Sequence, residues 1–249
     1  MVVFQQYGTQ RTGTNYCKDL FNTNYKNIKV IEFLNSKHHL APPVYKADKK
    51  TTEYVNQNYD KETTESLLST ISKNEIKNLI IIRNPYAWIE SLWRFGFEME
   101  YGPEAYIYFQ KPPPEKNNIN WLFERPSLDQ QAHAVEKSIK SYNMRYEKWF
   151  EVATEIVRQE DLLLDYQLVL KYFEQKYDLI KTQTDFFNIK EPCGPYIEFE
   201  GCGSDKNCFY KNYYLNHKYM NNLPATTINL ITQTVDWGLF RGVGYYPFE

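Results

Sequence analysis

The chain has little of several features that would assign a protein to a class at once. It has only four cysteines in 249 residues, too few for a scaffold built on disulfides. No stretch approaches ~18 consecutive apolar residues, so no membrane-spanning helix is expected. The formal net charge is -2 and the isoelectric point is about 6.2, which argues against a dedicated nucleic-acid binder. Any anion site must therefore be a local group of cations.

Linkers and repeats are also missing, and 42% of the residues are hydrophobic, so we expect one domain spanning residues 1–249. The first residues enter a strand pattern without a basic and apolar leader, which makes a cytoplasmic location the expectation. Two segments interrupt the regular pattern. An irregular, aromatic-rich insertion is expected at about 97–126, and a cysteine-containing loop at about 191–210.

The cysteine-containing loop holds three of the four cysteines, Cys193, Cys202 and Cys208. No two of them form a C-x-x-C pair, so a zinc site is disfavoured and no metal is expected. A local disulfide would need an oxidising compartment. Three reduced thiols are the favoured interpretation, and their pairing stays open.

Hydrophobic periodicity predicts strands and helices in alternation. A short apolar run at 2–7 and the stretch 27–34 predict strands, and the near-continuous apolar run at 78–83 is typical of a strand covered on both faces. The stretch 153–164 resembles a further strand that leads into a loop. Helical patterns separate them at 14–22, at 61–74, from Pro85, and along 128–149. Asn84 can cap the helix that Pro85 opens. This order favours an α/β fold in three layers, with a mainly parallel central sheet and helices on both faces, like that of the P-loop nucleoside triphosphatases.

The stretch VVFQQYGTQRTGTNYCKDLF at residues 2–21 predicts a strand, a tight loop and a helix. Gly8 and Gly13 bracket four residues, which is the glycine spacing of a phosphate-binding P-loop, although a turn that needs only glycine's backbone freedom has the same spacing. A triphosphatase places a lysine after the second glycine, but this chain has Thr14. The loop offers one cation, Arg11, together with threonine hydroxyls, which suits an anionic ligand that needs no metal.

A second anion-binding feature follows the strand NLIII. In triphosphatases this strand commonly ends in an aspartate that supports magnesium, whereas here Arg83 takes that place. An arginine at the carboxyl end of a buried strand faces the crevice where α/β proteins bind ligands, and it binds anions through two parallel hydrogen bonds. Ser91 lies eight residues further on, in the next predicted helix. The sequence therefore suggests two anion sites for two phosphates of one nucleotide.

With these motifs the chain resembles the PAPS-dependent sulfotransferases. Their first signature, P-K-S-G-T-T-W after a strand, is matched by QRTGTNY at 10–16. Their second, an arginine that ends a strand and a serine eight positions later, is matched by RNPYAWIES at 83–91. The segment VRQEDLLLD is similar to the family's strand and "YEDL" motif, and GVGY near the end is similar to its usual C-terminus. The resemblance implies 3'-phosphoadenosine-5'-phosphosulfate (PAPS) as the donor.

The resemblance also implies roles for individual residues. The 5'-phosphosulfate would be held by Arg11, Thr12, Gly13, Thr14 and Asn15. Arg83 and Ser91 would hold the 3'-phosphate, and Tyr16, which replaces the family's tryptophan, would stack on adenine. Arg11 replaces the loop lysine and so offers two parallel donors to the leaving group. The family's C-terminal "RKG" motif is absent, and Lys206 and Lys211 are its conceivable substitutes.

The acceptor side is predicted in the stretch SKHHLAPP. Histidine titrates in the useful range for a base, and Lys37 would stabilise charge on the bridging oxygen. The cytosolic sulfotransferases align His39 with their base, whereas other branches select His38, and this choice stays open. Glu32 is the reserve candidate, with a structural charge as the competing interpretation. Solvated loop histidines without chemistry are the alternative for the pair.

The sequence thus favours an enzyme that moves a sulfuryl group to a hydroxyl acceptor, plausibly a carbohydrate, with no nucleic-acid partner. The aromatic-rich residues 93–109 would form an acceptor wall or, equally, core or oligomer contacts. A small-molecule or nucleotide kinase of the same fold is the alternative, disfavoured by Thr14 and Arg83. A non-catalytic nucleotide-binding protein is the third hypothesis. The oligomeric state is not predicted.

Overall fold

The structure is a computed structural model that describes residues 1–9, 12–31, 49–94, 128–189 and 206–248. The predicted aromatic-rich insertion at 97–126 lies outside the described residues. So does the cysteine-containing loop, apart from the backbone of 206–210.

The described residues form one parallel sheet of four strands in the order β2-β1-β3-β4. The strands are β1 (Val2–Tyr7), β2 (Ile28–Ile31), β3 (Lys77–Ile82) and β4 (Glu155–Arg158). The central strands β1 and β3 are parallel neighbours, with Tyr7 opposite Ile80. Four successive residues at the end of β3 are fully buried, as expected for a strand covered on both faces. The parallel sheet predicted from the apolar runs is confirmed.

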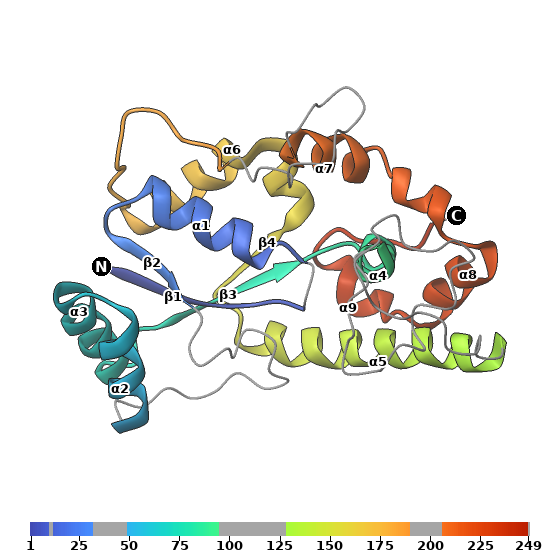
Figure 1. Cartoon of the computed structure of the whole chain (residues 1–249), viewed down its shortest axis with the longest axis horizontal. Helices are drawn as coiled ribbons and strands as arrows, with labels where there is room; N and C mark the ends of the chain where they lie inside the picture. Colours follow the sequence, from blue (N-terminus) through green and yellow to red (C-terminus); the bar gives the residue numbers. More distant parts are fainter. Residues whose placement is uncertain (10–11, 32–48, 95–127, 190–205, 249) are drawn as a thin grey trace, which may run out of the picture.

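Helices connect the strands and continue beyond the last one. They are α1 (Thr14–Asn24), α2 (Lys49–Asn58), α3 (Lys61–Ser72), α4 (Pro85–Arg94), α5 (Leu128–Val152), α6 (Gln159–Tyr177), α7 (Lys206–Leu215), the 3-10 helix η3 (Lys218–Asn222), α8 (Ala225–Thr234) and α9 (Trp237–Arg241). Figure 1 shows α1 and α6 on one side of the sheet, with α5 on the other side. The layered α/β fold predicted from the sequence is therefore present.

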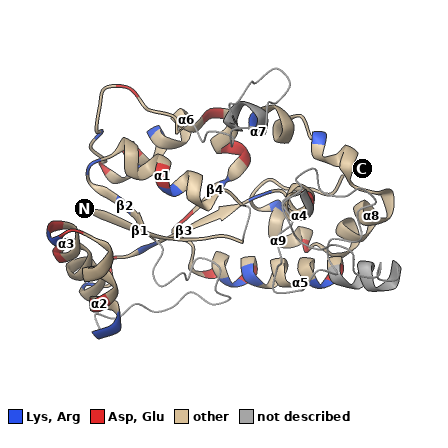
Figure 2. Cartoon of the chain, in the orientation of Figure 1, with Lys and Arg blue, Asp and Glu red and all other residues tan. Residues whose placement is uncertain are grey.

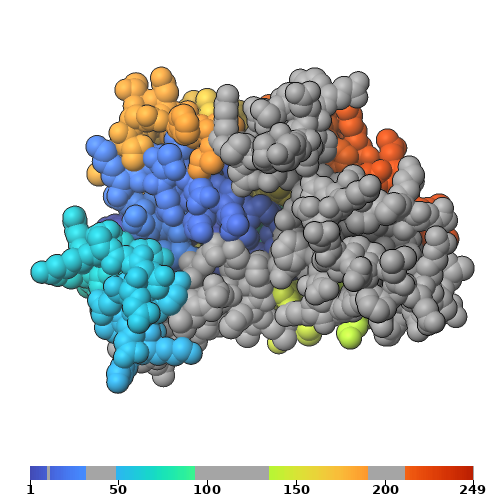
Figure 3. All heavy atoms as spheres, viewed as in Figure 1, coloured from blue at the N-terminus to red at the C-terminus, as the bar shows by residue number. Residues whose placement is uncertain are grey.

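The alternation of side chains along β1 explains the layers. Phe4 lies in a buried cluster with residues of α1 and α6, whereas Val3 lies in a cluster with residues of α2 and α3. Tyr7 and Ile80 belong to a third cluster, formed with α4, α5 and the helices near the carboxyl end. Successive residues of a strand point to opposite faces, so this short apolar run can attach helices on both sides. Figure 3 shows α2 and α3, in cyan, as a lobe beside the blue amino-terminal residues.

Two elements differ from the sequence-based expectation. Helix α2 was not predicted, because its residues are mostly polar and only Thr51 and Val55 are buried. The segment after β4 was expected to be a loop, but α6 begins directly at Gln159. Its first turn carries Glu160 and Asp161, which favour a helix start, and Leu162 and Leu163 after them are buried.

Charges of both signs are interspersed over the described helices (Figure 2), in keeping with the small net charge. Within the described residues, no helix is long and apolar enough to cross a membrane.

Candidate functional site

The strand order reverses at β1, because β2 and β3 lie on opposite sides of it. This reversal brings together the loops that follow β1 and β3. From β1 the chain passes through α1 to β2 on one side, and then through α2 and α3 to β3 on the other side of β1. The carboxyl ends of β1 and β3 are thus adjacent, at a switch point where open α/β sheets bind ligands. The loop that begins at Gly8 follows β1, and Arg83 follows β3.

Gly8 is required because the loop passes very close to β3. A Cβ atom at Gly8 would lie 2.7 Å from Oγ1 of Thr12, 2.8 Å from the carbonyl oxygen of Ile81 and 2.8 Å from Cγ2 of Thr14. Backbone of a neighbouring strand cannot move away as a flexible side chain can. The glycine therefore allows the loop to fold onto the end of β3.

Gly13 is required for a different reason. Its φ of 83° lies in the left-handed region that favours glycine, and it is the N-cap of α1. A Cβ there would lie 3.2 Å from the side chain of Gln159, the first residue of α6. Both glycines of the predicted motif thus have a structural cause, and the loop lies between β3 and the start of α6.

The described part of the loop closes on itself and leads into the positive end of α1. Oγ1 of Thr12 donates to the carbonyl oxygen of Thr9 at 2.7 Å, and both threonines are buried. In the described structure, α1 has no side-chain cap at Gly13 and no acidic residue in its first turn. A helix start of this kind attracts anions through its backbone N–H groups and its dipole.

Two tyrosines of α5, one helical turn apart, hold the end of β3. The hydroxyl of Tyr146 donates to the carbonyl oxygen of Ile81 at 2.8 Å and also accepts from the backbone N–H of Thr9 at 3.4 Å. The hydroxyl of Tyr142 donates to the carbonyl oxygen of Arg83. Burial raises the pKa of both phenols, so both remain donors at neutral pH. Helix α5 therefore fixes the loop and the Arg83 backbone together.

Arg83 is a deeply buried cation, with 2% of its surface exposed. The centroid of the Tyr214 ring, from α7, lies 3.8 Å from its Cζ atom. This distance is that of a close cation–π stack. Next to it, the side-chain oxygen of Asn84 accepts the N–H of Tyr86 at 3.0 Å, which confirms the predicted cap of α4.

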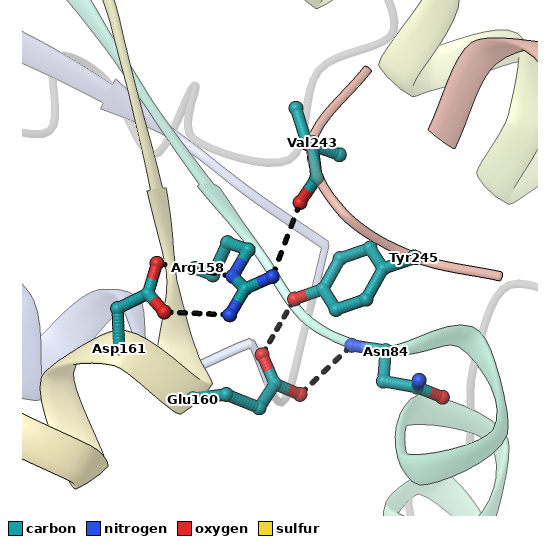
Figure 4. Close-up of polar contacts among 6 residues, drawn as sticks. All are labelled: Asn84, Arg158, Glu160, Asp161, Val243 and Tyr245. Carbon is teal, nitrogen blue, oxygen red and sulfur yellow. Dashed lines mark hydrogen bonds and ion pairs between the residues drawn. The ribbon is translucent and has the colours of Figure 1, made fainter. Parts of the chain in front are cut away.

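A carboxylate joins the residue after Arg83 to the carboxyl end of the chain (Figure 4). Oε1 of Glu160 accepts the backbone N–H of Asn84 at 3.0 Å, and Oε2 accepts the hydroxyl of Tyr245. Burial and then the Glu160 charge raise the pKa of Tyr245 well above its ordinary value. Glu160 and Tyr245 come from the QEDL and GVGY motifs, so these two segments meet at the same edge of the sheet.

Arg158 makes a second link between the same two segments (Figure 4). Its guanidinium forms two hydrogen bonds with Asp161, at 2.7 and 3.0 Å, and a weaker one, 3.4 Å long, with the carbonyl oxygen of Val243. Gly244 has a φ of 81°, and a Cβ there would lie 2.6 Å from Nη1 of Arg158. Glycine is thus needed where the chain passes over this guanidinium.

Two buried polar atoms near these elements have no hydrogen-bond partner among the described residues. One is Oγ of Ser91 on α4, a residue with 1% of its surface exposed. The other is Oε1 of Gln159, beside Gly13. A buried polar atom without a partner is costly, so each is a position where a ligand's hydrogen-bonding group would be accommodated.

Several predicted site residues lie outside the described residues. They are Arg11, Glu32, Lys37, His38 and His39. Their roles, as donor-binding or catalytic residues, stay predictions.

The other predicted residues are described. Thr12, Gly13 and Thr14 lie in the loop and the first turn of α1, whereas Asn15 is exposed. The hydroxyl of Tyr16 donates to Oδ1 of Asn188 at 2.7 Å. Its ring belongs to the cluster between α1 and α6, and its stacking on adenine stays a prediction.

Other predicted contacts are placed only in part. Lys211 is exposed, and its ammonium donates to the carbonyl oxygen of Leu164 at 3.2 Å. The side chain of Lys206 and the thiols of Cys193, Cys202 and Cys208 lie outside the described atoms. Among the described residues, no group of three or more His, Cys, Asp or Glu side chains forms a metal site.

Sequence reasoning missed four residues that shape this site. Three of them, Gln159, Glu160 and Tyr214, lie against the loop or the residues after β3 from distant parts of the chain. The fourth, Tyr245, donates its hydroxyl to Glu160. The similarity of QEDL and GVGY to family motifs had marked two of these segments without assigning a role. Tyr214 stands among many tyrosines in the sequence, and nothing local distinguished it.

Comparisons with known proteins add little to this picture. No protein-family model matches the chain, and no curated protein matches it. Among solved structures, the chain is similar to a sulfotransferase domain from the curacin biosynthetic pathway. The sequence identity is 12%, the alignment covers 98% of each chain, and the TM-score is 0.40.

Proposed function

We propose that this protein is a sulfotransferase that moves a sulfuryl group from PAPS to a hydroxyl acceptor. The observation that carries the proposal is that two elements suited to anion binding lie at adjacent strand ends, at one switch point of the sheet. The loop that ends at Gly13 leads into the uncapped start of α1, and Arg83 follows the neighbouring strand. Two such elements suit a nucleotide with phosphates at both its 5' and 3' positions.

The residue types distinguish this proposal from a kinase. A kinase of this fold needs a loop lysine for the terminal phosphates and an acid near the strand end for magnesium. Thr14 and Arg83 stand in those two places. Ser91, with a buried hydroxyl that has no partner among the described residues, supplies a further donor for the 3'-phosphate.

The proposed step is an in-line displacement at sulfur. The acceptor oxygen forms a bond to sulfur while the bond between sulfur and the bridging phosphate oxygen breaks, and adenosine 3',5'-bisphosphate leaves. His38 or His39 takes the acceptor proton, and Lys37 with Arg11 stabilises the charge on the leaving oxygen. A carbohydrate is the acceptor class to test first, because aromatic residues at 93–109 suit contacts with sugar rings.

Calorimetry with adenosine 3',5'-bisphosphate and with ATP–Mg tests the donor assignment. We expect tighter binding of the bisphosphate, and tighter binding of ATP–Mg would support the kinase instead. Transfer of labelled sulfuryl groups from PAPS to a panel of sugars and other alcohols tests the reaction. Loss of transfer in His38→Ala or His39→Ala, with unchanged bisphosphate affinity, would identify the base. Donor binding without transfer to any acceptor would favour a non-catalytic nucleotide-binding protein.

A further inference from the structure

We propose that Tyr214 is a positioning residue that selects for the 3'-phosphate by fixing the plane of the Arg83 guanidinium. This inference rests on the proposed function, because Arg83 is there the ligand of the 3'-phosphate. Tyr214 itself need not touch the nucleotide. Its contribution acts through the orientation of Arg83.

The contact between the two side chains is close and excluded from solvent. The Tyr214 ring centroid lies 3.8 Å from Cζ of Arg83, and each residue has only 2% of its surface exposed. An aromatic ring at this distance covers one face of the guanidinium. The N–H groups of a guanidinium lie in its plane, so a stacked arginine binds anions at its edge.

The backbone of Arg83 is fixed independently of this contact. Its carbonyl oxygen accepts the hydroxyl of Tyr142, and the next N–H is bound by Glu160. The long side chain between this backbone and the guanidinium has several rotatable bonds. Tyr214 fixes the guanidinium end of the Arg83 side chain. The fixed backbone and the fixed end together define where the plane of the guanidinium lies.

Hydrogen bonds to neighbouring helices hold α7, and with it Tyr214, in place. The hydroxyl of Tyr213 donates to Oε1 of Glu90 on α4 at 2.6 Å. The side-chain amide of Asn222, in η3, donates to the same carboxylate oxygen and to the Tyr213 hydroxyl. On its other side, Lys211 donates to the carbonyl oxygen of Leu164 in α6. Figure 1 shows α7 beside α6. Glu90 also directly precedes Ser91, so α7 is attached to the helix that carries the second predicted 3'-phosphate ligand.

The test compares two nucleotides that differ only in the 3'-phosphate, adenosine 3',5'-bisphosphate and adenosine 5'-monophosphate. The ratio of their dissociation constants measures what the 3'-phosphate contributes to binding. Removal of the ring face in Tyr214→Leu should reduce this ratio about tenfold, within the range expected for a cation–π contact. The affinity for the monophosphate should change less than about twofold, since that ligand does not use the fixed plane.

Two variants serve as controls. Tyr214→Phe keeps the ring face and should retain the ratio of the unmodified protein. Tyr213→Leu removes the neighbouring tyrosine and its hydrogen bond to Glu90 but keeps the contact between Tyr214 and Arg83. It therefore measures the effect of weakening the attachment of α7 alone. Should Tyr214→Leu fail to fold, as judged by circular dichroism, Tyr214→Met offers a side chain of greater length that also lacks a ring.

Each outcome has a distinct meaning. A Tyr214→Leu or Tyr214→Met protein that keeps the full ratio, or that loses affinity for both nucleotides equally, overturns the inference and leaves the proposed function intact. An unmodified protein that shows no preference for the bisphosphate overturns the proposed function and this inference with it. A reduced ratio in the leucine variant, restored in the phenylalanine variant, supports the positioning role.

Discussion

The carboxylate of Glu160 accepts the backbone N–H of Asn84 at 3.0 Å, across 76 positions of the sequence. This bond joins the start of α6 to the residue that follows Arg83. The same carboxylate accepts the hydroxyl of Tyr245, so one side chain connects two strand ends and the carboxyl-terminal segment.

Replacement of Glu160 by alanine should destabilise the fold. The Asn84 N–H and the Tyr245 hydroxyl would lose their acceptor, and each buried donor left without one costs ~1–3 kcal/mol. We expect the free energy of unfolding in urea to fall by ~2–4 kcal/mol in Glu160→Ala and by less in Glu160→Gln, which keeps an acceptor oxygen. Asp161→Asn is the control, because its partly exposed ion pair with Arg158 should contribute only ~0–1 kcal/mol. Equal effects of Glu160→Ala and Asp161→Asn would contradict the prediction.

Arg83→Ala should weaken the binding of adenosine 3',5'-bisphosphate by ~1.5–3 kcal/mol, as the loss of a charge-assisted contact does. Calorimetry measures this change directly. Adenosine 5'-monophosphate, which lacks the 3'-phosphate, should be affected much less. An unchanged affinity for the bisphosphate would remove Arg83 from the binding site.

Ser91→Ala should weaken the binding of adenosine 3',5'-bisphosphate without lowering the free energy of unfolding. The Ser91 hydroxyl is buried and has no hydrogen-bond partner among the described residues, so its removal takes no described contact from the fold. We expect the free energy of unfolding to stay within ~0.5 kcal/mol or to rise. Affinity for the bisphosphate should fall by ~1 kcal/mol if the hydroxyl binds the 3'-phosphate. A marked loss of stability would show that Ser91 has a structural partner instead.

Gly8→Ala should both destabilise the fold and impair nucleotide binding. A methyl group there would lie 2.8 Å from the Ile81 carbonyl oxygen, and the loop would have to move away from β3. We expect a loss of ~1–3 kcal/mol in unfolding free energy, together with loss of nucleotide binding. Gly242→Ala is the matched control: its nearest neighbouring atom is 3.9 Å from the added carbon, and its φ of -59° suits alanine. A Gly8→Ala protein that binds the bisphosphate normally would exclude the loop as its site.

Alkaline pH should destabilise the protein through its buried tyrosines. Burial raises the pKa of Tyr142, Tyr146 and Tyr245, so the folded state keeps protons that the unfolded chain releases above about pH 10. The unfolded state then binds fewer protons, and the free energy of unfolding falls as pH rises. It should be insensitive to these groups below about pH 9 and decline by ~1.4 kcal/mol per pH unit for each such tyrosine above pH 10. Urea titrations between pH 7 and 11 measure this slope. Tyr146→Phe removes one of these phenols, so it should reduce the slope above pH 10 by ~1.4 kcal/mol per pH unit.

Local patterns predicted the parts of the site that are local in sequence. The spacing of Gly8 and Gly13 predicted the strand, loop and helix, because close approach and a left-handed turn both require glycine at fixed positions. The apolar run before Arg83 predicted a buried strand, which is β3 in the structure. Asn84 and Pro85 predicted the start of α4.

The remaining features depend on contacts between distant residues. Tyr214 is 131 positions from Arg83, and no periodicity relates the two. The bond from Tyr245 to Glu160 likewise joins segments that are 85 positions apart. The polar helix α2 has few buried residues, so hydrophobic spacing could not reveal it. Such pairings are set by packing of the whole chain, which a single sequence does not display.

The contacts of Gly244 and Tyr245 have a practical consequence for recombinant protein. Only four residues would separate an affinity tag fused after Glu249 from Tyr245, whose hydroxyl binds the Glu160 carboxylate. A tag placed before Met1 would emerge where β1 begins, at the other end of this strand from the glycine loop (Figure 1). Purification through the amino end is therefore the safer choice for every titration described above.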